Sequence, residues 1–250
     1  MKIVSITATY KRKDITVDTI KLLTTQKNLV GAVVVGSCDE DFKAAEQVGA
    51  VYVQHNNAPL SNKWQAGLNK AREFDPDAVL ICGSNDWLTS NWCDACIKEG
   101  LNKGIDYIGS DILYCCDARP DHTLKILKIR SLQPWGGWKI PTGAGSMISR
   151  NILDKLNWQV FPVGLDISVD SYIREKIKNV NGQAGVIGDI KDVSLCCVYS
   201  VWNSLHDWEW FMHRIDSKDY PRVTLFKDIK NPAQWLAKNY PGISIEKYKK

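Results

Sequence analysis

Short apolar runs alternate with amphipathic stretches through the first half of the chain. Four runs have the length and composition of buried β-strands: Ile3–Thr9, Ala32–Val35, Ala50–Gln54 and Ala78–Cys82. Three stretches between them repeat apolar residues at helical spacing: Asp14–Gln26, Asp39–Val48 and Ser61–Phe74. Asp14 and Ser61 are suited to cap the helices that they begin. The alternation is typical of βαβ units that feed a mostly parallel sheet.

The pattern changes after the fourth strand. A helix over Ser90–Lys103, with Gly100 and Gly104 as C-cap positions, precedes a strand over Asp106–Tyr114. Ile112–Cys116 and Leu124–Arg130 then alternate apolar and polar residues around a turn, as in a hairpin, so the sheet becomes mixed. The later elements are strands Ser146–Ser149 and Val193–Val201 and helices Arg150–Leu156 and Asp170–Lys178. We predict an α/β fold in which helices flank a mixed, mostly parallel sheet within a single domain over residues 1–250.

Composition excludes several classes of protein. With 44% hydrophobic and 24% charged residues in 250, the chain is neither disordered nor fibrous and can bury a sizeable core. A formal net charge of +4 is too small to indicate nucleic-acid binding, but it suits an anionic ligand. The first residues lack the apolar region of a signal peptide, and the longest apolar run, Leu29–Gly36, is far shorter than a membrane span. We therefore expect a cytoplasmic protein without a membrane span.

The eight cysteines are predicted to be reduced packing residues. Cys93 and Cys96 form a CxxC, but it falls inside a predicted helix and no second CxxC follows at zinc-finger spacing. Two further pairs, Cys115-Cys116 and Cys196-Cys197, lie in strand patterns, where adjacent side chains point to opposite faces. Disulfide and zinc chemistry are not expected.

The loops after three predicted strands carry the candidate chemistry. In open α/β sheets, ligands bind beyond the carboxyl ends of the strands, where loops meet helix N-termini. These loops are Thr7–Lys13, Gly36–Asp39 and Gly83–Trp87. None contains GxGxxG or GxxxxGK, so dinucleotide-dependent dehydrogenases and P-loop NTPases lose their main support.

Four stretches, taken in order, carry a resemblance to a known family. They are Val4–Arg12; Val35–Asp39; Pro59–Leu68 leading into Val79–Asp86; and Thr142–Arg150 followed by Gly164–Asp166 and Asp170. Together they resemble the GT-A glycosyltransferases, and within them the family 2-like enzymes that use nucleoside diphosphate sugars. The resemblance implies a GT-A, Rossmann-like fold with a nucleotide-binding half (1–110), an acceptor half (111–200) and a Trp-rich C-terminal extension (201–250).

The resemblance implies a donor site in the first half. The residues expected to bind the nucleotide sugar are Thr7, Tyr10, Asp39, Lys63, Ser84 and Asn85. Ser84-Asn85-Asp86 stands where the family has its acidic DxD-type motif, so one carboxylate replaces two or three. Asp86, with His206 from the late chain, is expected to hold Mn²⁺ or Mg²⁺, since Mg²⁺ commonly uses few protein carboxylates beside phosphates and waters. The alternatives are that Asp86 caps the next helix and Asp39 is a first-turn acid.

The second half is expected to supply the acceptor site. An inverting transferase needs a carboxylate that takes the proton of the acceptor hydroxyl. The sequence predicts Asp166 in this role with Asp170 beside it, four residues later on one helical face. Alternatively, Asp166 or Ser168 caps the following helix. Trp135, Trp138 and Gly145 are expected to contact the acceptor, since aromatic faces suit sugar rings, although tryptophan is also a common core residue.

The function predicted from these residues is transfer of a sugar from a nucleoside diphosphate sugar to a hydroxyl acceptor. The donor base stays open among UDP, GDP and dTDP, and the acceptor among a glycan, a protein and a modified nucleic acid. Two rivals are a carbohydrate- or nucleotide-binding module that has lost turnover, suggested by Ser84 and Asn85, and a nucleotidyltransferase. The latter lacks its usual glycine-rich, lysine-bearing loop after the first strand.

Overall fold

The computed structural model describes residues 1–120, 122–131, 134–135, 138–139, 141–167, 169–199, 212 and 223–249. Its main sheet has seven strands in the order β12-β6-β11-β4-β1-β2-β3. The strands are β1 (Ile3–Ala8), β2 (Leu29–Gly36), β3 (Val51–Gln54), β4 (Ala78–Ile81), β6 (Tyr107–Gly109), β11 (Ser146–Ser149) and β12 (Ala184–Val186). Every pairing in it is parallel except those of β11, which runs antiparallel to β4 and β6. The predicted mixed, mostly parallel sheet is therefore confirmed.

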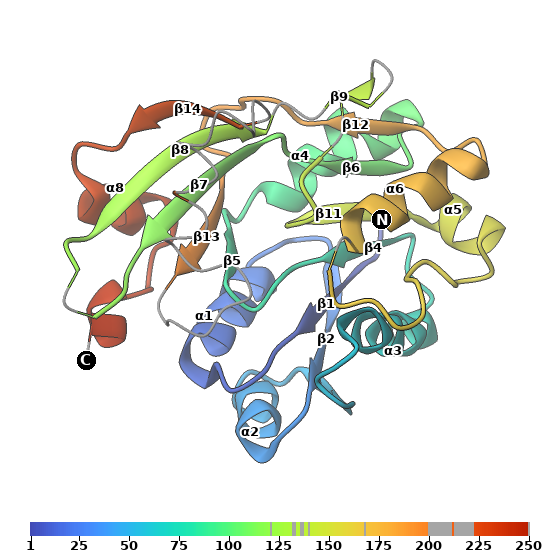
Figure 1. The fold of residues 1–250 in the computed structure, drawn as a ribbon, viewed down its shortest axis with the longest axis horizontal. Helices are drawn as coiled ribbons and strands as arrows, with labels where there is room; N and C mark the ends of the chain where they lie inside the picture. Colours follow the sequence, from blue (N-terminus) through green and yellow to red (C-terminus); the bar gives the residue numbers. More distant parts are fainter. Residues whose placement is uncertain are drawn as a thin grey trace.

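Helices cover both faces of this sheet (Figure 1). They are α1 (Lys13–Thr24), α2 (Asp39–Gln47), α3 (Leu60–Ala71), α4 (Trp92–Glu99), α5 (Arg150–Lys155) and α6 (Val169–Asn179). One face packs α3, α5 and α6 against alternate strand residues such as Val4 and Ile6. The other packs α1, α2 and α4 against intervening residues such as Ile3 and Val34. Because both faces are buried, the strands read as apolar runs in the sequence.

A second sheet lies beside the first and carries the C-terminal segment (Figure 1). Its order is β14 (Val223–Asp228), β8 (Lys125–Ser131), β7 (Ile112–Asp117), β13 (Leu195–Tyr199) and β5 (Asp86–Leu88). The predicted hairpin is confirmed as the antiparallel pair β7 and β8. Helix α8 (Pro232–Asn239) and the 3₁₀ segment η3 (Ile245–Lys249) pack against the edge strand β5 of this sheet. Leu236, Tyr240 and Tyr248 lie there in one apolar cluster with Trp87. The division of the chain at residues 110 and 200 stays a prediction.

Three local predictions are wrong. The expected strand Asp106–Tyr114 divides into β6 and β7, which lie in different sheets. Ser110 makes the break, because its carbonyl accepts the Thr142 amide and its hydroxyl accepts the Ile112 amide. Asp14 is a first-turn residue of α1, whose N-cap is Arg12. Pro59, not Ser61, is the N-cap of α3.

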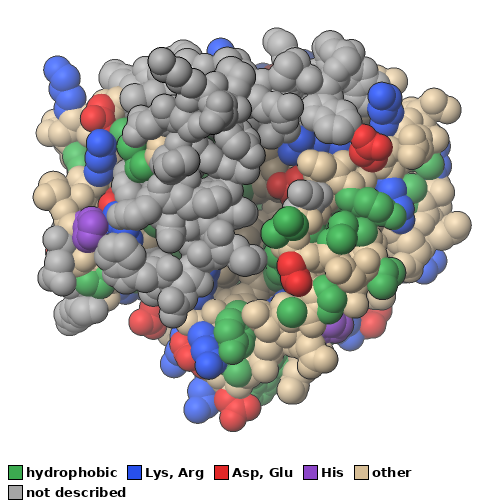
Figure 2. Space-filling model, in the orientation of Figure 1, with side chains coloured by type: hydrophobic (Ala, Val, Ile, Leu, Met, Phe, Trp, Pro, Cys, Tyr) green, Lys and Arg blue, Asp and Glu red, His purple; other side chains and the backbone are tan. Residues whose placement is uncertain are grey.

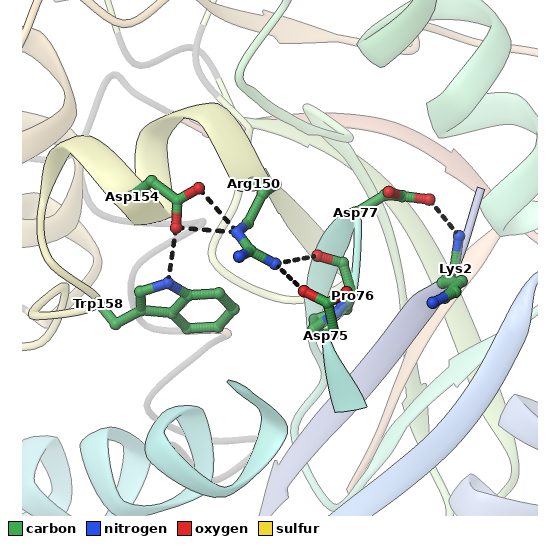
Figure 3. A network of polar contacts seen from close by, with 7 residues as sticks. All are labelled: Lys2, Asp75, Pro76, Asp77, Arg150, Asp154 and Trp158. Carbon is green, nitrogen blue, oxygen red and sulfur yellow. Dashed lines mark hydrogen bonds and ion pairs between the residues drawn. The ribbon is translucent and has the colours of Figure 1, made fainter. Parts of the chain in front are cut away.

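An arginine fastens α5 to the chain segment before β4 (Figure 3). Arg150 at the start of α5 donates to Asp75 at 2.7 Å and to Asp154 at 2.7 Å. Asp154 also accepts a hydrogen bond from the indole nitrogen of Trp158 at 2.9 Å. Hydrogen bonding to Arg150 lowers the pKa of Asp75. This network lies at the amino end of β4, opposite the edge where ligands are expected, so its role is to hold the fold.

The cysteines lie in the elements that the sequence predicts. Cys93 and Cys96 are on α4, and the two adjacent pairs are on β7 and β13. All eight are free, and all except Cys38 are buried. Burial raises the pKa of Cys93 to about 12. The Cys93 thiol is therefore a protonated packing group. Within the described residues, no helix is long and apolar enough to cross a membrane.

Candidate active site

A cavity of about 360 Å³ opens at the carboxyl ends of β1 and β4, beside the start of α3. Its lining comes from the loops after β1, β3 and β4, from the loop before β11, from α3, and from β5 and β13. The residues are Ala8, Thr9, Tyr10, Arg12, Asn57, Leu60, Lys63, Trp64, Gly83, Ser84, Asn85, Asp86, Ala144, Cys197 and Tyr199. The sequence argument placed ligands at this edge of the sheet, and the cavity lies there.

Lys63 is the buried cation that joins the loops around the cavity. Its side chain extends from α3, and its ammonium donates to the Thr9 carbonyl, to Ser37 Oγ at 2.8 Å and to Asn57 Oδ1 at 3.2 Å. The residue is 1% exposed, and burial lowers the pKa of Lys63 to about 8. Three neutral acceptors thus hold a positive charge with no carboxylate within ion-pair distance in the described part of the chain.

Asp86 is the single acid among the described residues of the cavity lining. It begins β5, and its Oδ2 accepts the Gly83 amide at 2.6 Å while its Oδ1 accepts the Cys197 thiol at 3.3 Å. Burial raises the pKa of Asp86, and the charge of Asp170 acts in the same direction. A Cβ on Gly83 would lie 2.7 Å from Asp86 Oδ2, so the glycine allows this turn to close on its own carboxylate.

Arg12 is a cavity residue that the sequence analysis did not select. It is the N-cap of α1, in the loop after β1. Burial lowers the pKa of Arg12, while the charges of Asp86 and Tyr199 raise it, so the guanidinium lies within electrostatic range of Asp86. The sequence does place Arg12 in the loop after the first strand, one of the three loops expected to bind a ligand. However, Arg12 stands between two lysines, and nothing in this basic run distinguishes a ligand-binding residue from a solvated charge.

Asp41, rather than Asp39, organises the loop after β2. Asp39 is exposed at the first position of α2 and does not line the cavity, so its placement fits the alternative of a first-turn acid. Asp41 is buried and accepts the amides of Lys11 at 2.9 Å and Ser37 at 2.8 Å. It therefore ties the loop after β1 to the loop after β2. Sequence reasoning missed it because its exposed neighbours are also acidic.

The remaining predicted donor residues divide between lining and support. Tyr10, Ser84 and Asn85 line the cavity, and Tyr10 is 42% exposed. The Asn85 amide donates to the Val198 carbonyl at 3.0 Å and so attaches this loop to β13. Thr7 lies within β1, before the loop that follows this strand, so its side chain is fully buried against the sheet and does not reach the cavity.

Asp166 and Asp170 have different surroundings. Asp166 Oδ1 accepts the Leu60 amide at 2.7 Å, so its carboxylate caps α3, a helix distant in sequence, and it does not line the cavity. Asp170, in the first turn of α6, lies against the loop that carries Ala144. A Cβ on Gly143 would come within 2.2 Å of Asp170 Oδ1. Asp170 also contributes to the raised pKa of Asp86 and of Tyr107, although burial is the larger cause for both.

The predicted acceptor residues are only partly described. Gly145 has a left-handed backbone (φ 63°), and its carbonyl accepts the Trp92 indole at 2.9 Å, so it packs on α4 rather than lining the cavity. Trp135 and Trp138 are paired in the backbone register of the short strands β9 (Pro134–Trp135) and β10 (Trp138–Lys139), and their side chains are not described. His206 and Ser168 also lie outside the described residues.

Exposed apolar side chains lie in the segment between α5 and α6, which contacts the start of α3. Val163, Leu165 and Ile167 precede α6, and they are 89%, 38% and 67% exposed. Ser61 Oγ accepts the Leu165 amide at 2.9 Å, which holds this segment at the start of α3. In Figure 2, apolar side chains gather on this part of the surface, to the right of centre.

The described residues do not fit a divalent metal centre. Mn²⁺ and Mg²⁺ prefer several oxygen ligands, usually carboxylates with phosphates and water. Asp86 is the one carboxylate of the described cavity lining, so these residues offer a metal ion a single carboxylate ligand. Within the part of the chain that the structure describes, no group of three or more His, Cys, Asp or Glu side chains could hold a metal ion. The expectation for His206 stays a prediction.

No family model matches this sequence, and no curated protein matches it. The fold, however, is similar to solved glycosyltransferase structures. The chain has the GT-A fold. A mannosyltransferase from Pyrobaculum calidifontis, in complex with GDP-Man and Mn²⁺, is 14% identical with a TM-score of 0.57, over 85% of this chain and 61% of that one. TarS 1-349 from S. aureus, in complex with UDP-GlcNAc, is 16% identical with a TM-score of 0.52, over 79% and 58%.

A third similar structure is glucosyl-3-phosphoglycerate synthase from Mycobacterium tuberculosis in complex with phosphoglyceric acid. It is 13% identical, with a TM-score of 0.50, over 75% of this chain and 70% of that one. The chain spans about three fifths of the length of the mannosyltransferase and of TarS 1-349. Similarity at these identities establishes the fold and leaves the reaction to be argued from the site.

Proposed function

We propose that this protein is a glycosyltransferase that moves a sugar from a nucleoside diphosphate sugar to an acceptor hydroxyl with inversion at the anomeric carbon. The observation that carries the proposal is the cavity at the carboxyl ends of β1 and β4, lined by Lys63, Arg12 and the Ser84–Asp86 loop. In open α/β sheets this edge is where nucleotides bind. The similar structures in complex with GDP-Man and UDP-GlcNAc support the same ligand class.

The cavity is built to bind an anion beside a ring. Tyr10 and Trp64 supply aromatic faces at the rim, and the Lys63 ammonium lies 5.9 Å from the Tyr10 ring centroid. Asn57 and Asn85 also line the cavity, where Asn57 Oδ1 accepts from Lys63 and the Asn85 amide donates to the Val198 carbonyl. The Lys63 ammonium lies between the loops after β1 and β2. Its positive charge can therefore stabilise a phosphate without rearrangement of these loops.

Of the two acids predicted as the base, the geometry favours Asp170. The Asp166 carboxylate already holds the amide that begins α3. Asp170 is also outside the cavity lining, but it lies against Gly143, next to the cavity residue Ala144, and within electrostatic range of Asp86. In the proposed step the acceptor oxygen forms a bond to the anomeric carbon and gives its proton to Asp170. The bond from that carbon to the diphosphate breaks, and the electron pair leaves with the diphosphate.

A panel of UDP-, GDP- and dTDP-sugars, each incubated with purified protein, tests this proposal through the nucleoside diphosphate released to water or to added acceptors. We expect release from at least one donor, and Asp170→Asn should lower kcat by about 10²- to 10⁴-fold, as expected for loss of a general base. Asp166→Asn is the matched control, for which kcat should stay near that of the wild type. Equal losses in both variants would contradict the assignment of Asp170.

The rival function, a nucleotide- or sugar-binding module without turnover, is favoured by one observation. Asp86 is the single remaining acid of the DxD-type position, and its carboxylate is engaged within the protein. A binding module would bind the same donors in calorimetry and release no nucleoside diphosphate from any of them. Measured turnover therefore separates the two functions.

A further inference from the structure

We propose that the charge of the donor's diphosphate is met by the side chains of Arg12 and Lys63, in place of a divalent metal ion. The inference rests on the proposed function, because it assigns the diphosphate subsite of that same cavity. The inference goes beyond the proposed function, because it predicts that the nucleotide still binds after metal ions are removed.

The first support is the state of Arg12. Its guanidinium lines the cavity at the N-terminus of α1, and with the described residues it forms no hydrogen bond or ion pair. A guanidinium presents five donors in a planar fork that matches phosphate oxygens in pairs. Its partial burial makes an unpartnered charge unfavourable, and a phosphate in the cavity would relieve that cost.

The second support is the fixed position of Lys63. Three acceptors from three loops hold its ammonium, and no carboxylate of the described residues pairs with it. It therefore acts as a point charge whose place is set before any ligand arrives. Among the described lining residues, Arg12 and Lys63 are two cations against one acid, Asp86, and this excess of positive charge suits a diphosphate.

The third support is the donor set at the DxD-type position. Ser84 and Asn85 stand where the family has carboxylates, and the Asn85 amide is used to attach β13. Both oxygens of Asp86 accept hydrogen bonds from Gly83 and Cys197. The departing diphosphate still needs positive charge as its bond to the sugar breaks. Within the described lining, Arg12 and Lys63 are the side chains that carry this positive charge.

Calorimetric titration of the protein with UDP, GDP and dTDP, in metal-free buffer with EDTA and again with MnCl₂, tests the inference. We expect at least one nucleoside diphosphate to bind with EDTA present, with an affinity within about twofold of that in Mn²⁺. Arg12→Gln should weaken this binding by about tenfold or more, the loss expected for a charge-assisted phosphate contact, and Arg12→Lys should restore part of it. Lys13→Gln, which removes a neighbouring cation outside the cavity lining, should bind like the wild type.

Two results would overturn the inference while leaving the proposed function in place: binding that requires Mn²⁺, or equal affinities for Arg12→Gln and the wild type. Failure of all three nucleotides to bind under either condition would overturn it together with the proposed function. Circular dichroism of each variant confirms that a loss of binding is not a loss of fold.

Discussion

Replacing Lys63 with methionine removes both the charge of this residue and the hydrogen bonds that hold three loops together. The substitution keeps a side chain of similar length but removes the charge and three hydrogen bonds, those to Thr9, Ser37 and Asn57. The pKa of Lys63 falls from 10.5 to about 8 on folding, so the folded protein loses about 3 kcal/mol by keeping this group charged at neutral pH. Each hydrogen bond from a charged group contributes about 1.5–3 kcal/mol in return.

Three such hydrogen bonds contribute about 4.5–9 kcal/mol, which exceeds the cost of about 3 kcal/mol. We expect Lys63→Met to lower the free energy of unfolding at pH 7 by about 1.5–6 kcal/mol, while nucleoside diphosphate affinity falls by about tenfold or more.

The pH dependence gives a sharper test. Between pH 8 and pH 10.5 the unfolded wild type binds a proton at Lys63 that the folded protein has lost, so wild-type stability from this group rises with pH across that window. Nucleotide affinity should do the opposite and fall as pH rises through about 8, because the ammonium loses its charge. Urea unfolding and calorimetry at pH 7 and pH 9.5 measure both. If the affinity of Lys63→Met falls with pH as steeply as that of the wild type, the reasoning is refuted.

Two further predictions follow from neighbouring contacts. Asp166→Ala should lower the free energy of unfolding by about 0.5–2 kcal/mol through loss of the cap on α3, with kcat unchanged; a large fall in kcat without loss of stability would return the catalytic role to Asp166. Gly143→Ala should displace Asp170, since the added carbon would lie 2.2 Å from its Oδ1, and so lower kcat more than nucleotide affinity; unchanged kinetics would show that the position of Asp170 does not matter.

The main sheet was predictable because both of its faces are buried. Strands β2 and β4 read as continuous apolar runs, β1 is an apolar run that contains Ser5 and Thr7, and the helices between the strands have clear amphipathic spacing. The three-residue strands β5 and β12 were not predicted, since such short segments show no period. The division of the expected Asp106–Tyr114 strand depends on hydrogen bonds that Thr142, more than thirty residues later, donates to the Ser110 carbonyl, and the local sequence pattern does not contain them.

The candidate site shows the same limit. Lys63, Tyr10, Ser84, Asn85 and Asp86 were selected from strand-end position and family resemblance, and all five line the cavity. The acids were harder to assign, because every strand-end loop offers several. Burial distinguishes Asp41 from Asp39, and a hydrogen bond across 106 residues distinguishes Asp166 from Asp170. Both distinctions depend on tertiary contacts.

A crystal structure of the protein with a bound nucleoside diphosphate, grown in the presence of EDTA, tests the central claim most directly. The account predicts electron density for the diphosphate in the cavity at the carboxyl ends of β1 and β4, with phosphate oxygens on Arg12 and near Lys63, and the base towards Tyr10 and Asn57. A nucleotide bound elsewhere on the molecule, or one whose phosphates point away from both cations, would contradict it.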